Sequence, residues 1–494
     1  MEIPHPEPLG RTDPRRTWRI ADDRRLPALE PFADRVHRHD PVVLREHLWD
    51  TDDRVLAAEG VELLASDVGW SVDRGDGPVP VDPDHEPRDV VEVFLRGRPV
   101  RVVRVRDTVT TLVELRGRDG RLRAEVADVR VDEGEPDGAV LRSSRWWALS
   151  DDGRDGTVSR AAERALADAA EPGPGGGVRG AAGRSGEGRS TGPGPTERRK
   201  GTAARPRRGS AAAALRTVLR SLRADLVAID PRVRADEHGA VHDLRKVLRR
   251  LRSVLAAYRG ALDPDATESL RAELAEVSRV AGIARDAEVL GDRLLRTAGR
   301  APEGFVDVAT LDRIGSQVAG SRAAATADLL RTLRSASWFR ALDRLDDLVA
   351  GSPRGPHADD DARAFAVRRI TRERKRVVAA IDDAGGTLDD LHEVRKAARR
   401  LRYASEAAGD GADLGKRRLG LLRRVQDGLG EVLDAAHATA ALRELASLAA
   451  ETGADTFGDG VLATIEHAVV EREQERVERL VARLRSRVTA GLRG

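Results

Sequence analysis

The sequence predicts an α+β multidomain protein in which an antiparallel β domain at 1–150 precedes an all-helical domain at 211–494. Residues 1–150 contain short β-like runs that are separated by Gly, Pro and Asp. After residue 210, apolar residues recur at helical spacing almost to the end of the chain. Between these parts, 151–210 is expected to be a linker, with a short helix or hinge at Asp152–Ala170 and a disordered Gly/Pro/Arg segment after it.

The N-terminal domain is predicted from short runs rich in valine. The clearest are Val90–Leu95, Val100–Arg106, Thr108–Arg116 and Arg121–Val126. Valine and threonine favour extended backbone, and the alternation of arginine with valine in the second run is typical of a half-buried strand. These runs indicate the antiparallel strands of a meander or barrel.

The C-terminal domain is predicted to contain two helical repeats, at about 211–350 and 359–490. Hydrophobic residues make up 40% of the chain and aromatic residues only 3%, so helices packed through small aliphatic contacts are expected. Turn and capping signals such as Asp263-Pro264 and Gly385-Gly386 divide the domain. The predicted helices are 211–229, 240–260, 264–282, 284–299, 309–335, 337–350, 359–383, 387–408, 413–428, 431–450 and 460–489.

The composition excludes several kinds of site. The chain has no cysteine, so disulfides, thiolate metal sites and cysteine nucleophiles are ruled out. It has no Gly-rich phosphate loop and no H-E-x-x-H motif, and His37, His39 and His47 lack metal-ligand spacing. We therefore expect no catalytic residue, no metal and no cofactor. Since no apolar run approaches the ~18 residues of a spanning helix, and no signal core is seen, we expect a cytoplasmic protein without a membrane partner.

The charge is unevenly distributed along the chain. The formal net charge is +2, but residues 1–150 hold 24 Arg and 31 Asp+Glu, which leaves −7 there and +9 in the remainder. An anionic partner is therefore expected to bind the C-terminal two thirds of the chain.

One cationic pattern occurs twice in the helical domain. Val241–Gly260 reads VHDLRKVLRRLRSVLAAYRG, and Leu391–Asp410 reads LHEVRKAARRLRYASEAAGD. Seven of eleven positions are identical at one offset of 150, which indicates an internal duplication. The repeated residues are His242, Arg245, Lys246, Arg249, Arg250, Leu251 and Arg252, and His392, Arg395, Lys396, Arg399, Arg400, Leu401 and Arg402. A second pair of segments, AGIARDAEVL (281–290) and LGEVLDAAH (429–437), follows the two copies at similar distances.

The pattern places positive charge on one helix face. At ~100° per residue, Arg245 and Arg249 fall within ~60° of His242, whereas Leu244, Leu251 and the other aliphatic residues of the first copy fall on the opposite face. Like charges at this spacing repel, and no acidic residue at helical spacing is expected to interrupt either cationic face. A bound anion would supply the missing charge: arginine binds phosphate through two parallel hydrogen bonds, and histidine can donate once it is protonated. The alternative is a solvated helix face, but two copies with the histidine in register favour an anion site.

A third cationic cluster occurs on the helix predicted at 359–383. Arg368, Arg372 and Arg376 share one face of that helix and could extend the basic surface. A solvated face is an equally good interpretation here, because this cluster has no duplicated partner of equal basicity.

The C-terminal domain resembles the CHAD family of conserved-histidine α-helical domains over about 211–490. The resemblance lies in HDLRKVLRRLR and HEVRKAARRLRY, each followed by a helix with the pattern Gly-x-x-x-Asp. It implies two pseudo-symmetric four-helix bundles whose basic helices face a central groove, where inorganic polyphosphate binds, and association with polyphosphate granules. The implied binding positions are His242, Arg245, Arg249, Arg250, Arg252, their counterparts at 392–402, and Arg285, which has Leu433 as its counterpart.

The N-terminal domain partly resembles the CYTH family, which binds triphosphates and metal in an antiparallel tunnel. The similar segments are HLWDTDDRVLAAEGVELL (47–64) and LRAEVADVRV (122–131). Where the family has Glu-x-Glu-x-Lys, this chain has RRTWRIADD (15–23), and residues 1–150 contain no lysine. Glu114, Glu125 and Asp128 remain at matching positions and are expected to be solvated. The domain is interpreted as a degenerate, catalytically silent relative.

Two other functions stay open at this point. A metal-dependent triphosphatase or polyphosphate hydrolase would need carboxylates for Mg²⁺ and cations for the phosphates, and the missing acidic motif argues against it. Nucleic-acid binding would draw on the same arginines, but single-strand binders use aromatic stacking platforms, and Tyr258 and Tyr403 are the only tyrosines. Polyphosphate binding without chemistry, and without a specific nucleic acid, is the function that the sequence favours.

Overall fold

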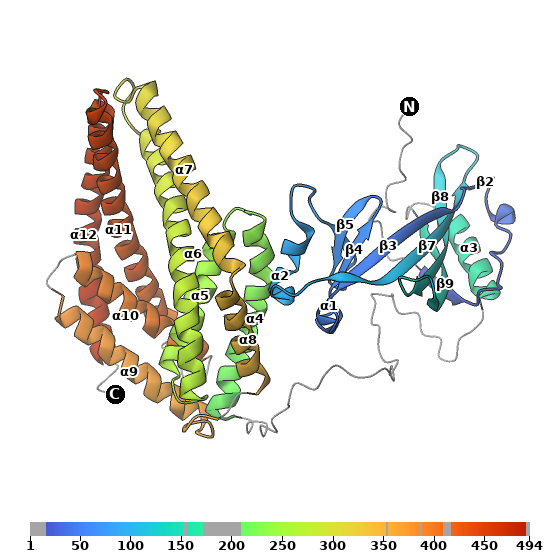
Figure 1. Ribbon diagram of the computed structural model, residues 1–494, viewed down its shortest axis with the longest axis horizontal. Coiled ribbons are helices and arrows are strands. Elements are labelled where there is room, and N and C mark those ends of the chain that lie inside the picture. The colour runs from blue at the N-terminus through green and yellow to red at the C-terminus, as the bar shows by residue number, and fades with distance from the viewer. Residues whose placement is uncertain are drawn as a thin grey trace. The chain divides into compact units, whose positions relative to one another are not determined.

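The computed structural model describes residues 16–151, 156–170, 209–351, 354–384, 388–408 and 416–490 (Figure 1). The chain falls into two compact units, one ending at Glu197 and the other beginning at Arg198. The first contains an antiparallel sheet and the second is helical, which confirms the predicted α+β multidomain class.

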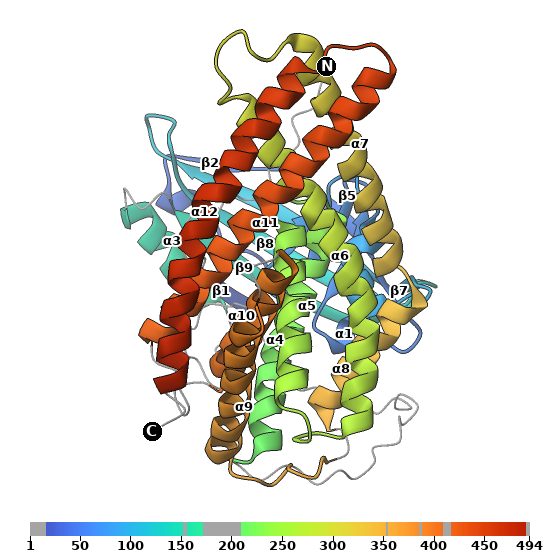
Figure 2. The same cartoon turned by 90° about the vertical axis from the view of Figure 1, so that its left-hand side faces the viewer.

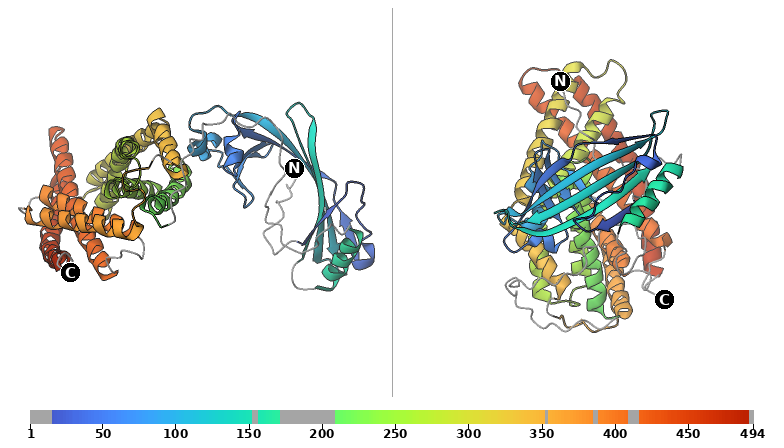
Figure 3. Two further views of the ribbon diagram at one scale, coloured as in Figure 1. Left: turned by 90° about the horizontal axis from the view of Figure 1, so that it is seen from below. Right: turned by 90° about the vertical axis from the view of Figure 1, so that its right-hand side faces the viewer.

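The strands of the first unit form one antiparallel sheet in the order β1-β9-β8-β7-β3-β4-β5-β6, and β2 also pairs with β7. The strands are β1 Arg16–Ile20, β2 Arg35–Arg38, β3 Val42–Asp50, β4 Glu62–Ser66, β5 Gly69–Asp73, β6 Pro78–Pro80, β7 Arg101–Arg116, β8 Leu122–Gly134 and β9 Val140–Asp151. Two meanders, β3 to β6 and β7 to β9, are joined where β3 pairs with β7. The long strands lie side by side in one twisted layer (Figure 3). Among the described strands the ends β1 and β6 do not pair, so the sheet stays open.

One helix covers part of this sheet. α3, Gly156–Ala169, lies against β8 and β9 and contributes Ala162 and Leu166 to a core that includes the fully buried Trp147. The segment 151–210 is thus not linker throughout, because α3 lies within it and packs on the sheet. Of the predicted disordered part at 171–210, residues 171–208 lie outside the described residues, whereas Ser210 is ordered as the N-cap of the helix that begins at Ala211.

Two details of the predicted strands are wrong. Val90–Leu95 is not a strand but two short helical turns, η2 Pro87–Val90 and α2 Glu92–Leu95, because a short apolar run fits a buried turn as well as a strand. The runs at Val100–Arg106 and Thr108–Arg116 form the single strand β7, since Asp107 keeps its place in the ladder and pairs with Arg45. The remaining short helices are α1 Val55–Ala58 and η1 Glu30–Phe32.

The second unit is a set of helices with an internal repeat. The helices are α4 Ala211–Arg234, α5 Ala240–Ala257, α6 Pro264–Ala298, α7 Val308–Leu333, α8 Ala336–Ala350, α9 Ala362–Asp382, α10 Leu388–Ala407, α11 Lys416–Glu451 and α12 Phe457–Ala490. At the offset of about 150 residues, α4 to α7 correspond to α9 to α12, and α8 follows the first set alone. α4, α5, α9 and α10 run side by side (Figure 2).

Two predicted helix breaks are wrong. The helices predicted at 264–282 and 284–299 form the single helix α6, and those at 413–428 and 431–450 form α11. Both predicted breaks fall beside glycines, Gly282 and Gly428, but one glycine costs a helix only ~1 kcal/mol, which tertiary packing offsets. Gly428 shows this packing, because an added Cβ would lie 2.8 Å from Val477 of α12.

Candidate anion-binding site

The two cationic stripes lie on adjacent helices. α5 packs against α10, and the Tyr258 hydroxyl at the end of α5 donates a 2.8 Å hydrogen bond to the Ala404 carbonyl. Leu251 of α5 and its counterpart Leu401 of α10 are both 0% exposed, so each helix buries the apolar face that its sequence predicts. Burying these faces turns the opposite, cationic faces away from the core.

A cavity of about 360 Å³ opens between α5, α6 and α10. Among the described residues, seven cationic side chains and no carboxylate line it. They are Arg245, Arg249, Arg252, Arg271, Lys396, Arg399 and Arg400, and we call this cavity the basic groove. Ser253 and Ser278 add two hydroxyl groups to its wall.

The cations of the groove repel one another in a partly dehydrated space. Burial, with Arg249 and Arg395 nearby, lowers the pKa of Arg399 to about 9. Burial lowers the pKa of Arg249 as well; the neighbouring Tyr403 opposes this shift, and Arg245 and Arg395 add to it. Arg399 therefore keeps its charge at neutral pH, so the unliganded groove carries an electrostatic cost that an anion would relieve.

Several of these arginines also lack hydrogen-bond acceptors. The Nε atoms of Arg249, Arg252, Arg271 and Arg400 are buried without a hydrogen-bond partner among the described residues. A buried polar group without a partner costs ~1–3 kcal/mol. An anion that brings several oxygens into the groove would satisfy such donors.

Other members of the stripes are paired with carboxylates, contrary to the prediction that no acidic residue interrupts the two faces. Lys396 pairs with Glu393 at 2.8 Å, and Arg402 lies 3.9 Å from Glu406. Both acids are on α10 itself, at helical spacing, so the second stripe is partly neutralised. From other helices, Arg245 pairs with Asp286 at 2.5 Å and Arg400 with Glu373 at 3.2 Å.

Glycines let two of the arginines lie against neighbouring helices. An added Cβ at Gly430 of α11 would lie 3.0 Å from Nη2 of Arg395, and one at Gly282 of α6 would lie 3.9 Å from Nε of Arg245. Four residues beyond each glycine stands an aspartate: Asp286 pairs with Arg245, and Asp434 lies near Arg395. The duplication is therefore present in the contacts as well as in the sequence.

The two histidines do not line the groove. Burial lowers the pKa of His242, and nearby Arg285 lowers it further. Burial also lowers the pKa of His392, with a second contribution from Lys396. Each histidine is therefore neutral in the unliganded protein at pH 7, and an approaching anion would raise its pKa.

The structure separates the remaining predicted positions. Arg372 and Arg376 of the third cluster line a second, smaller cavity next to the groove, whereas Arg368 pairs with Asp360. Arg285 pairs with Glu288 at 2.8 Å. The predicted residues that line neither cavity are His242, Lys246, Arg250, Arg285, His392, Arg395, Arg402 and Arg368.

Three charged lining residues were missed by the sequence reasoning: Arg259, Arg271 and Glu373. Arg271 of α6 lines both cavities, yet its i,i−3 ion pair with Glu268 resembles an ordinary solvated pair. Glu373 of α9 lines the smaller cavity and is 2% exposed, although its neighbours in sequence are arginines and lysine. A contact between helices leaves no local pattern in the sequence. The signal that could have singled out Glu373 was its position as a lone carboxylate within a run of cationic residues.

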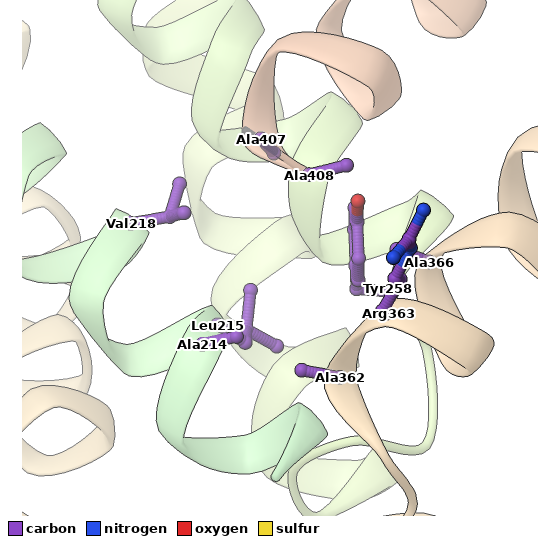
Figure 4. A pocket seen from close by; sticks show the side chains of 9 residues that line it. All are labelled: Ala214, Leu215, Val218, Tyr258, Ala362, Arg363, Ala366, Ala407 and Ala408. Carbon is purple, nitrogen blue, oxygen red and sulfur yellow. The ribbon is translucent and has the colours of Figure 1, made fainter. Parts of the chain in front are cut away.

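A third pocket, of about 170 Å³, has a different character (Figure 4). Alanines, Leu215, Val218 and Tyr258 line it, with Arg363 as its one charged residue. Since it offers little to an anion, the basic groove is the better candidate site.

Carboxylates of the N-terminal sheet are already paired with arginines. Glu114 lies 2.8 Å from Arg116, and Asp128 lies 2.6 Å from Arg145. Their side chains are only 16% and 15% exposed, so the expectation that they are solvated is wrong. In the part of the chain that the structure describes, no three His, Asp or Glu side chains gather as a metal site would require. None of its helices combines the length and apolarity needed to cross a bilayer.

Comparison with known proteins identifies the family of the helical unit. Residues 217–443 match the family model of the CHAD domain, which covers the basic groove, and the chain therefore contains a CHAD domain. An uncharacterized protein of Mycobacterium tuberculosis, found in two strains, is 34% identical over 263 residues. The match covers 52% of this chain, which spans about half the length of those relatives (50%).

Two solved structures are also similar. PptA from Streptomyces chartreusis has a TM-score of 0.47 and 22% identity, over 55% of this chain and 99% of that one. The CHAD domain from the plant Ricinus communis has a TM-score of 0.43 and 20% identity, over 57% of this chain and 92% of that one. Nothing in these comparisons assigns a family to the N-terminal sheet.

Proposed function

We propose that the helical unit binds inorganic polyphosphate in the basic groove, without chemistry on it, and so targets the protein to polyphosphate granules. The observation that carries the proposal is the meeting of the two repeated stripes at one cavity with seven cations and, among the described residues, no lining carboxylate. The CHAD family is associated with polyphosphate binding, and the family match includes this cavity.

The shape of the charge favours a linear polyanion. Arg245, Arg249 and Arg252 follow one another along α5, while Lys396, Arg399 and Arg400 follow one another along α10. A polymer with one negative charge per phosphate could neutralise both rows at once, and each released counterion would add to affinity at low salt. A single small anion would contact only part of these two rows.

Competition between polyanions tests the proposal. We expect long polyphosphate to displace labelled polyphosphate at a far lower phosphate concentration than single-stranded DNA or RNA does. The comparison is made at one fixed salt concentration, because both polymers release counterions. Equal displacement by nucleic acid at equal phosphate concentration would refute the assignment to polyphosphate.

The proposal also assigns no hydrolysis to the N-terminal sheet. This part of the proposal is supported by two ion pairs. Arg116 and Arg145 already neutralise Glu114 and Asp128, two of the carboxylates with which a metal-dependent triphosphatase would bind its metal.

A further inference from the structure

The smaller cavity beside the basic groove has its own chemistry. It measures about 100 Å³ and shares Ala256, Arg271 and Arg400 with the groove. Unlike the groove, it contains a carboxylate, that of Glu373. The charged residues that line it are Arg259, Arg271, Arg372, Glu373, Arg376 and Arg400, and we call it the Glu373 pocket.

Glu373 is held by two arginines, and one of its carboxylate oxygens accepts no hydrogen bond from the described residues. Its side chain is 2% exposed, and Oε1 accepts a 2.6 Å hydrogen bond from Arg376. Nε of Arg400 lies 3.2 Å from Oε2, but Oε2 is buried with no hydrogen bond from the described residues. The ion pair with Arg400 compensates the charge of this carboxylate, but Oε2 keeps the capacity to accept a hydrogen bond from a further donor.

The arginines of the pocket alone would favour any phosphate, but a carboxylate oxygen that accepts no hydrogen bond from the described residues favours a phosphate that carries a proton. An inner phosphate of a polyphosphate chain has an anionic oxygen and no hydroxyl. A terminal phosphate has one further ionisable oxygen, which titrates near neutral pH (roughly 6 in a phosphate monoester). In its protonated form it offers one O–H donor together with anionic acceptors.

We propose that the Glu373 pocket binds the terminal hydrogen phosphate of a chain whose inner phosphates lie in the basic groove. The terminal hydroxyl donates to Oε2 of Glu373, and the anionic oxygens accept from Arg271 and Arg372. Arg400, which lines both cavities, stands where the inner chain meets its end group. The inference rests on the proposed function and adds recognition of chain ends to it.

Chains with blocked ends test this inference on the unaltered protein. Methyl esters at both termini remove the ionisable hydroxyl and keep one negative charge per phosphate. At pH 6, short uncapped chains are expected to bind about tenfold more tightly than capped chains of equal length, the size of one charge-assisted hydrogen bond. This advantage is expected to shrink as pH rises and the terminal hydroxyl ionises. Equal affinity of capped and uncapped chains at pH 6 would overturn the inference.

A variant and a matched control locate the effect. Glu373→Gln is expected to erase the preference for uncapped chains, because the amide group weakens the acceptor. Glu273→Gln is the control, since Glu273 also pairs with two arginines, Arg340 and Arg344, and lines neither cavity. The control is expected to keep the preference. Preservation of the preference in a folded Glu373→Gln protein would contradict the assignment to this pocket.

Inorganic phosphate offers the same chemistry as a chain end. If it abolishes the advantage of uncapped chains, the pocket also takes free hydrogen phosphate. If it does not, the pocket takes a phosphate only as the end of a bound chain. Either result supports a hydrogen-phosphate pocket, whereas absence of binding by any polyphosphate would instead refute the function proposed for the groove. Should Glu373→Gln fail to fold, the comparison of capped and uncapped chains remains decisive.

Discussion

Arg249 and Arg399 stand 150 residues apart in the sequence, occupy the same position in the two repeats, and line one cavity. Burial and Arg249 together account for much of the lowered pKa of Arg399, which falls to about 9. Two guanidinium groups thus meet where the folded protein supplies no compensating ion pair from its described residues. We infer that the fold tolerates this repulsion because a ligand relieves it.

Removing one of these charges is expected to stabilise the free protein and to weaken its binding of polyphosphate. Arg399→Met keeps an apolar stem of similar size and removes the repulsion, so unfolding should require about 1 kcal/mol more free energy without ligand. Polyphosphate affinity should fall. Denaturant unfolding and titration on the same sample measure both. The stability gain should shrink above pH 9, where Arg399 of the unaltered protein loses its proton. A loss of stability with Arg399→Met would contradict the repulsion argument.

Polyphosphate affinity is expected to rise as pH falls. The pKa of His242 and that of His392 are lowered in the free protein, so both are neutral above about pH 6.5, the ordinary histidine pKa. A bound anion raises these pKa values, so binding takes up protons and strengthens as pH falls through the interval between free and bound values. Affinity measured from about pH 5.5 to 8 checks this. With both histidines changed to Gln the profile should flatten, and an unchanged slope would refute their role.

Replacing Gly430, the glycine beside Arg395, with alanine is expected to lower the affinity of the basic groove for polyphosphate. The Cβ of Gly430→Ala would lie 3.0 Å from Nη2 of Arg395 and displace that side chain, which stands near Arg399. Affinity should fall about fivefold, which corresponds to ~1 kcal/mol. Gly460→Ala on α12 is the control, because nothing lies within 4 Å of its added Cβ. Calorimetric titration of both variants tests the point, and equal affinities would count against it.

We expect that the N-terminal domain does not hydrolyse triphosphate or polyphosphate in the presence of Mg²⁺ or Mn²⁺. Glu114 and Asp128 are engaged by arginines rather than free to hold metal. A phosphate-release assay on the full chain checks this. Turnover that Glu114→Gln abolishes would show that the ion pair opens for metal and would restore the hydrolase alternative.

Local periodicity was enough to predict the helices that carry the site. The spacing of Leu244 and Leu251 placed the apolar face of α5, and both residues are 0% exposed. The duplication then implied a second helix with the same face. Helix ends at glycines were not predictable in this way, because the packing that keeps α11 continuous at Gly428 comes from Val477, far along the chain.

The pairing of individual charges was beyond the sequence reasoning. Glu373 and Arg400 lie on different helices, 27 positions apart, and Asp286 reaches Arg245 from α6. Such contacts depend on how helices pack, which neither periodicity nor composition encodes. The stripes were predicted as uniformly cationic for this reason, whereas the structure divides them into paired and unpaired members.

Affinity for long polyphosphate, measured for the unaltered chain and for the His242/Arg249/His392/Arg399→Ala variant, tests the central claim most directly. A control, Arg331/Arg472→Ala, removes two arginines whose side chains are 72% and 70% exposed on α7 and α12. We predict that the first variant loses well over tenfold in affinity, with unchanged helicity by circular dichroism, and that the control stays within about twofold. Equal losses in both variants would show that polyphosphate responds to overall charge and not to the duplicated groove.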